Sequence, residues 1–148
     1  MIRITKEFSF EMSHLLEGYD GMCSQIHGHS YRLFVTVGGE PLNAPDDPKE
    51  GMVMDFGELK RIVNRLVVER FDHSLMIRRT AATEGLRTAL KGHLERIVEV
   101  DYRPTCENMV AAIATEIAAE LPPQVRLCGV CLYETATSYA EWEALKIY

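Results

Sequence analysis

Two long segments with alternating side chains, residues 2–14 and 27–38, impose the strongest constraint on the fold of this chain. In each segment, apolar or aromatic residues recur at every second position, which is the pattern of a β-strand with one buried face. Histidines share that face at the end of the first segment (His14) and at the start of the second (His27 and His29). If the two strands pair antiparallel, the three imidazoles meet at one end of the pair.

Three imidazoles that meet in this way are typical of a metal site. Three neutral nitrogens about 2.0–2.1 Å from one ion, with a fourth position open, form a catalytic rather than a structural zinc centre. The alternative is a set of ordinary surface or core histidines, since a His-x-His pair also arises by chance. Three of the five histidines of the chain fall between positions 14 and 29, and this clustering favours the metal site.

Cys23 lies four residues before His27 and has two possible roles. As a fourth ligand it would close the metal site. As a free thiol beside a cation it would ionise more readily and serve as a general base or nucleophile. The spacing permits both roles.

Two further positions carry side chains suited to chemistry. Asp72 and His73 follow a predicted helix and form either a surface turn or a general acid–base histidine oriented by its carboxylate. Glu134 ends an apolar strand. A carboxylate on such a face needs a partner, for example a planar edge with two donors, unless it only marks where the strand meets solvent.

The remaining elements are read from periodicity and capping. Apolar residues at helical spacing predict a helix from residue 56 to about residue 70, capped by Asp55, and another that begins after Thr105 and stops at Pro122. Glu107 falls in the first turn of the second helix, where a negative charge is favourable. A short helix over 80–91, a strand over 97–100 and a hairpin of strands 125–134 and 138–147 complete the set.

This β-β-α-α-β-β order, with short insertions, predicts an α+β fold in which an antiparallel sheet carries helices on one face. The length of 148 residues predicts a single domain over residues 1–148. The net charge of −6 argues against a nucleic-acid partner. No apolar run approaches the length of a membrane span, and the N-terminus lacks the apolar core of a signal peptide. We therefore expect a cytoplasmic protein with no membrane partner.

Six short motifs occur in the order that is typical of one enzyme family. The chain resembles the 6-pyruvoyl-tetrahydropterin synthase family, and within it the bacterial 6-carboxy-tetrahydropterin synthases of the queuosine pathway. The motifs are Phe8–His14, Cys23-x-x-x-His27-Gly28-His29, Met52–Phe56, Phe71–His73, Pro104–Asn108 and Tyr133–Thr135.

The resemblance implies the tunnelling fold (T-fold), in which subunits join their sheets into a barrel, commonly a hexamer of two stacked trimers with active sites between subunits. It also implies roles for single residues. The zinc ligands would be His14, His27 and His29, the proton-transfer group would be Cys23, Asp72 and His73, and the substrate-binding residues would be Glu134, which grips the pterin ring, with Thr105 and Glu107.

The activity implied is the conversion of 7,8-dihydroneopterin triphosphate into 6-carboxy-5,6,7,8-tetrahydropterin, with release of acetaldehyde and triphosphate. The three residues between Cys23 and His27 are similar to the carboxy-forming branch, whereas the long segment between His73 and Pro104 departs from it and is expected to alter the substrate entrance. Three alternatives stay open: a pyruvoyl-forming or other pterin side-chain lyase, a cupin-like metal oxygenase, and a non-catalytic zinc protein whose site Cys23 closes.

Overall fold

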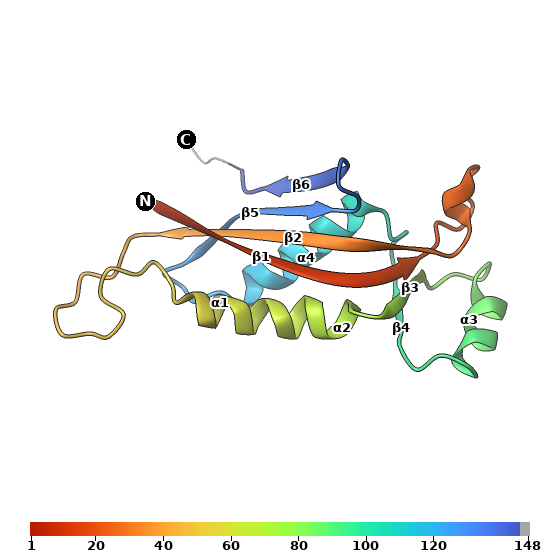
Figure 1. Ribbon diagram of the computed structural model, residues 1–148, viewed down its shortest axis with the longest axis horizontal. Helices are drawn as coiled ribbons and strands as arrows, with labels where there is room; N and C mark the ends of the chain where they lie inside the picture. The colour runs from red at the N-terminus through yellow and green to blue at the C-terminus, as the bar shows by residue number, and fades with distance from the viewer. Residues whose placement is uncertain (146–148) are drawn as a thin grey trace.

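The computed structural model describes residues 1–145, whose strands form one six-stranded sheet in the order β4-β3-β1-β2-β5-β6 (Figure 1). The helices α1, α2 and α4 cover one face of this sheet, and α3 lies near β3 and β4 at its end (Figure 1). This arrangement confirms the α+β prediction. The strands are β1 (Ile2–His14), β2 (His27–Gly39), β3 (Ser74–Arg78), β4 (Ile97–Val100), β5 (Arg126–Tyr133) and β6 (Tyr139–Glu143).

The sheet is mixed rather than wholly antiparallel. The pairs β1–β2, β2–β5 and β5–β6 are antiparallel, whereas β3 lies parallel to β1 and β4 lies parallel to β3. The sequence analysis predicted β4 at its observed bounds but missed β3. The apolar run of β3 is short and buried on both faces, so it lacks the alternation that identifies a half-buried strand.

The first helical segment combines α1 (Phe56–Val63), a π-helical turn η2 (Asn64–Val68) and α2 (Glu69–Phe71). Its buried residues are spaced four apart: Leu59, Val63, Val67 and Phe71. An α-helix has 3.6 residues per turn, so a spacing of four would rotate steadily away from the core, and the wider π turn corrects this drift. The segment ends directly before Asp72, which places Asp72 and His73 at the corner between α2 and β3.

The second long helix, α4 (Cys106–Glu120), begins as predicted. The Thr105 side chain accepts a hydrogen bond from the backbone N–H of Asn108 at 3.2 Å, which caps the helix. The apolar side of α4 packs in the same core as Tyr31 and Leu33 of β2. This packing brings the loop before α4 under the end of β1.

The insertion between β3 and α4 holds β4 and a short helix, α3 (Glu84–Lys91). No residue of α3 is buried. At the C-terminus, β6 ends at Glu143, short of the predicted strand end at residue 147; residues 146 and 147 lie outside the described residues. No helix within residues 1–145 has the length and apolar character needed to cross a membrane.

Candidate metal centre

The three predicted histidines converge at one end of the β1–β2 pair. The register places His14 directly opposite His27, and His29 lies two residues further along the same face. The Nε2 atoms of His14 and His27 are 3.1 Å apart, and one ligand nitrogen from each of the three rings lies within 4.8 Å of the others. Strand alternation and antiparallel register are therefore sufficient to form the cluster.

Backbone carbonyls fix the protonation of two of these rings. The Nδ1 atom of His14 lies 2.8 Å from the carbonyl oxygen of Pro104, and that of His27 lies 2.8 Å from the carbonyl oxygen of Gln25. A carbonyl only accepts, so each Nδ1 carries the hydrogen and each neutral ring presents an Nε2 lone pair. The 3.1 Å contact between the two Nε2 atoms is then a repulsive contact of two acceptors, which a cation between them would relieve.

The third ring, that of His29, also presents a nitrogen that a cation would stabilise. The Nε2 atom of His29 is buried and has no hydrogen-bond partner within residues 1–145. A buried polar atom without a partner is costly, and at a ligand position it points to an ion. The donor set is three imidazole nitrogens with their outer nitrogens partly held by carbonyls, which fits a zinc ion.

Burial favours the neutral form of two of the three rings. Burial lowers the pKa of His14 to about 4, repulsion from His27 and His29 acts in the same direction, and the hydrogen bond to Pro104 opposes it. Burial likewise lowers the pKa of His29. Neutral imidazole is the form that binds a metal, so the lowered pKa values of His14 and His29 favour metal binding.

Glu134, just after β5, places its carboxylate over the cluster. Its Oε1 atom lies 3.4 Å from Nε2 of His14 and 3.6 Å from Nε2 of His29. The Nδ1–H of His14 is held by the carbonyl of Pro104, so this oxygen faces the Nε2 lone pair of that ring. The carboxylate is 26% exposed, so it can also meet a ligand that enters from solvent. Beneath it, burial and the charge of Glu134 raise the pKa of Tyr31, which stays a neutral phenol.

Asp72 and His73 form a hydrogen-bonded pair at the corner between α2 and β3. The Nδ1 atom of His73 lies 2.9 Å from Oδ2 of Asp72. The backbone of Glu11 in β1 holds both residues: its N–H donates to Oδ1 of Asp72 at 2.9 Å, and its carbonyl accepts from the N–H of His73 at 2.6 Å. The bond from Glu11, with smaller contributions from His73 and Arg96, lowers the pKa of Asp72, which is therefore ionised and orients the imidazole.

His73 adopts a backbone conformation that is uncommon for residues other than glycine. Its φ of 57° lies in the left-handed region, after Asp72 with φ −60° and ψ 128°. These angles resemble those of a type II turn, which favours glycine at the second central position. A histidine held in this conformation is a candidate for function rather than for local stability.

One cavity lies beside His73 at the β1 edge of β3 and β4. It has a volume of about 650 Å³ and lies along β1, β2 and the starts of β3 and β4. Its lining includes Glu11, His29, Ser30, His73, His93 and Arg96. His73 faces this cavity, whereas His14 and His27 are not among its lining residues. Ser13, Gly28 and Ser30, which do line it, alternate with the three histidines along β1 and β2 and so belong to the other face of the sheet.

The other predicted site residues lie apart from this cavity. Cys23 belongs to the short helix η1 (Met22–Ser24), is half-buried, and contributes neither to the three-histidine group nor to the cavity lining of the described residues. Thr105 uses its side chain as the cap of α4. Glu107 is exposed, and its side chain makes no hydrogen bond or ion pair within residues 1–145.

Sequence reasoning missed the groups that orient the site. These are the carbonyls of Gln25 and Pro104 and the backbone of Glu11. Every residue carries such groups, so residue type holds no signal for them. The side chain of Arg96, which lines the cavity and lies in the insertion, was also missed.

Comparisons with known proteins show the family of the chain. A family model described as 6-pyruvoyl tetrahydropterin synthase matches residues 3–144. A 6-carboxy-5,6,7,8-tetrahydropterin synthase of Haemophilus influenzae is 34% identical over 144 residues, which are 97% of this chain and 99% of that protein. The protein of the same name from Aquifex aeolicus is 34% identical over 131 residues, covering 82% of this chain and 75% of the relative.

Solved structures show the same fold. An uncharacterized protein of Wolinella succinogenes superposes with a TM-score of 0.79 at 21% identity, over 97% of this chain and 98% of the other. The 6-pyruvoyl tetrahydropterin synthase of Caenorhabditis elegans superposes with a TM-score of 0.68 at 22% identity, over 97% and 96% of the two chains. The predicted T-fold is therefore confirmed.

Proposed function

The chain belongs to the 6-pyruvoyl tetrahydropterin synthase family, and on that premise we propose that it is a zinc-dependent lyase that acts on 7,8-dihydroneopterin triphosphate. The proposed products are 6-carboxy-5,6,7,8-tetrahydropterin, acetaldehyde and triphosphate, as in the queuosine pathway. The printed names of the H. influenzae and A. aeolicus relatives support the carboxy-forming product. The observation that carries the proposal is the pair of Nε2 lone pairs of His14 and His27, 3.1 Å apart, with a nitrogen of His29 within 4.8 Å of both.

The three histidines would hold the zinc ion through their Nε2 atoms. The carbonyls of Pro104 and Gln25 orient two of the rings and increase their basicity as ligands. Bound there, zinc supplies Lewis-acid chemistry, which lowers the pKa of hydroxyl groups on the substrate side chain. Cys23 is not a member of the group of His14, His27 and His29 whose ligand atoms converge among the described residues, which supports an open site over one that this thiol closes.

His73 would move protons at the substrate side chain. Its Nδ1–H is held by the ionised carboxylate of Asp72, so its Nε2 is the nitrogen free to accept and return a proton. The imidazole is 75% exposed at the cavity, which leaves room for substrate. Cys23 would act as the second proton-transfer group, and an active site shared between subunits accounts for its separation from His73 within one chain.

Glu134 would grip the pterin ring. A carboxylate that faces the planar edge formed by the ring N3–H and the 2-amino group accepts two parallel hydrogen bonds. Its place beside His14 and His29 would hold the ring with its side chain next to the metal. Thr105 and Glu107, on the first turn of α4, are proposed as further substrate-binding residues supplied at the subunit boundary.

We also propose a single cytoplasmic domain that assembles as a hexamer of two trimers. The edge strands β4 and β6 leave ladder groups without partners in the described chain, and closing a barrel between subunits removes such edges. Sedimentation velocity tests this assembly. A monomer that is stable and active would overturn it.

The test of the activity is incubation of zinc-supplemented protein with 7,8-dihydroneopterin triphosphate, with products identified by mass spectrometry. We expect 6-carboxytetrahydropterin with acetaldehyde and triphosphate, loss of turnover with a chelator, and recovery with zinc. A pyruvoyl product would instead favour the pyruvoyl-forming alternative. Zinc-loaded protein that leaves the substrate unchanged would overturn the proposal and favour a non-catalytic or cupin-like metal protein.

A further inference from the structure

Arg96 occupies a place in the insertion that mirrors the place of His73. His73 directly precedes β3 and Arg96 directly precedes β4, and the two strands pair in parallel with Leu75 opposite Ile97. The backbone N–H of Leu75 donates to the carbonyl of Arg96 at 2.9 Å. Parallel pairing therefore places the two strand starts side by side, although twenty-two residues separate His73 from Arg96.

From this position the guanidinium group reaches the end of the helix that carries the acid–base pair. Its Nε atom donates to the carbonyl of Asp72 at 3.0 Å, and its Nη2 atom donates to the carbonyl of Glu69 at 2.7 Å, with a longer contact to that of Arg70 at 3.5 Å. The last carbonyls of a helix have no partner within the helix, and a cation there also complements the helix dipole. The planar fork of arginine spans carbonyls that a lysine cannot reach together.

The contact at Asp72 is the one that bears on chemistry. On the β1 side, the backbone of Glu11 binds the carboxylate of Asp72 and the N–H of His73. On the opposite side, Arg96 binds the carbonyl of Asp72. This carbonyl belongs to the peptide unit that links Asp72 to His73. His73 sits in the left-handed conformation with φ 57°, and a strained backbone persists only where surrounding contacts enforce it. The Arg96 contact is one of the few that reach this corner.

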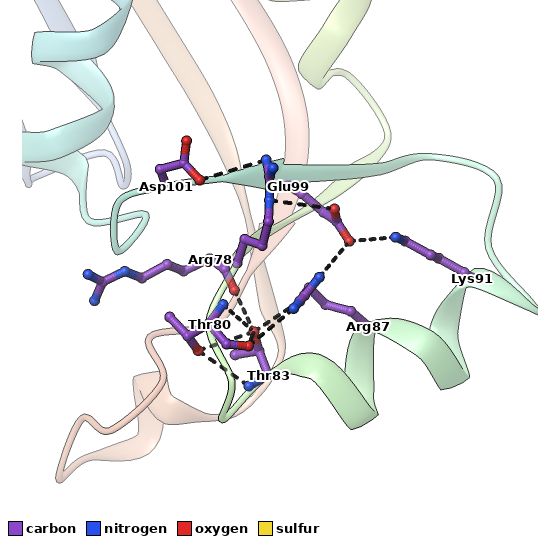
Figure 2. A network of polar contacts seen from close by, with 8 residues as sticks. Arg78, Thr80, Thr83, Arg87, Lys91, Glu99 and Asp101 are labelled. Carbon is purple, nitrogen blue, oxygen red and sulfur yellow. Dashed lines mark hydrogen bonds and ion pairs between the residues drawn. The ribbon is translucent and has the colours of Figure 1, made fainter.

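The insertion that carries Arg96 is itself anchored elsewhere (Figure 2). The carboxylate of Glu99 in β4 meets Lys91 at 2.8 Å, Arg87 at 3.2 Å and Arg79 at 3.9 Å, so that α3 and both strands are tied together (Figure 2). The hydroxyl of Thr83 adds a hydrogen bond to the carbonyl of Arg78 at 2.6 Å. No bond of this network reaches Asp72 or His73, so the described residues supply a control for general loosening of the insertion.

We infer that Arg96 is a positioning residue, which fixes the Asp72–His73 peptide through its carbonyl contacts and so aims the His73 imidazole into the cavity that both His73 and Arg96 line. The inference rests on the proposed function, because it assigns Arg96 to the proton-transfer pair of that same site. It also gives the long insertion a role, since a direct connection from β3 to α4 would leave no β4 to carry this arginine to the corner.

The first measurement is independent of turnover. In zinc-supplemented protein with ¹⁵N-labelled histidine, the His73 ring nitrogens are assigned by the signals that disappear in His73→Asn. We expect the Nδ1–H tautomer in the wild type. Arg96→Ala should shift these nitrogens and mix the two tautomers, with zinc content unchanged. Arg96→Lys, which keeps the charge and loses the fork, should give an intermediate shift and covers the case in which the alanine variant does not fold.

The second measurement is steady-state kinetics with the proposed substrate. Arg96→Ala should lower kcat by about 10- to 100-fold, the scale expected for a misplaced reacting group, with KM changed far less. The control Arg87→Ala breaks the Glu99 network and should leave both the His73 signals and kcat near the wild-type values.

Unchanged His73 signals in both Arg96 variants would overturn the inference, as would equal changes in Arg87→Ala, which would show general loosening. Altered His73 signals together with an unchanged kcat would also overturn it, because the imidazole would then need no such alignment. If the wild type turned over no pterin while the His73 signals responded as expected, the proposed function would fail and the structural role of Arg96 would stand.

Discussion

The buried, neutral His14 predicts how the free energy of unfolding depends on pH, and the size of this effect follows from the structure. The side chain is 1% exposed, and its pKa falls from an ordinary value of 6.5 to about 4 in the folded protein. Each unit of pKa difference between the folded and unfolded states corresponds to about 1.4 kcal/mol. This single ring therefore links the free energy of unfolding of the metal-free protein to pH by about 3 kcal/mol.

The sign follows from which state binds the proton more tightly. Between about pH 4 and pH 6.5 the unfolded chain protonates this histidine and the folded chain does not. The free energy of unfolding therefore rises with pH across that interval. The full stability is present above the unfolded pKa and is lost as the pH falls toward about 4. The lowered pKa of His29 acts in the same direction.

The assay compares wild-type protein with His14→Asn, both freed of metal by a chelator. The asparagine amide can keep a hydrogen bond to the carbonyl of Pro104 but does not titrate. Urea unfolding, followed by circular dichroism and by the fluorescence of Trp142, is measured at several pH values between 4.5 and 7.5. Carboxylates affect both proteins equally, so the difference in slope isolates His14, and we expect the wild type to be steeper by nearly one proton in the middle of the interval. Equal slopes would refute the assignment of a buried, neutral His14.

Four further predictions concern single side chains of the site. His27→Ala and His29→Ala should each lose stoichiometric zinc and turnover together, and full zinc content by mass spectrometry in both variants would contradict the three-histidine assignment. Cys23→Ala should keep its zinc while turnover falls by roughly 10²–10⁴-fold, the usual contribution of an acid or base; loss of zinc would make Cys23 a ligand. Glu134→Gln should keep zinc and raise KM for the pterin substrate, because the amide retains the shape and loses the charge, and zinc loss would instead reveal a fourth ligand. His73→Gly should unfold in urea at a free energy about 1 kcal/mol higher than His73→Ala, since glycine accepts the positive φ without a side-chain clash; equal stability would argue against that conformation.

Much of the candidate site could be predicted from the sequence because it depends on local geometry. Alternation with a period of two assigns one face to each strand, and the antiparallel pairing of β1 with β2 follows from their length and patterning. Strand alternation and this pairing are sufficient to bring His14, His27 and His29 together. The caps at Asp55 and Thr105 were equally predictable, since each depends on one side chain and a backbone N–H two or three residues away.

The tertiary structure decided which atoms of these residues face one another. Carbonyls of Gln25 and Pro104 select the imidazole tautomers, and residue type does not indicate where a carbonyl will lie. Packing of α4 against the sheet brings Pro104 to His14 across ninety positions of sequence. Parallel pairing of β3 and β4, absent from the predicted order, carries Arg96 to the end of α2. Local sequence determined which faces the histidines occupy. The tautomer of His14 and the orientation of the Asp72–His73 pair depend instead on contacts with distant segments, because only the assembled core sets those distances.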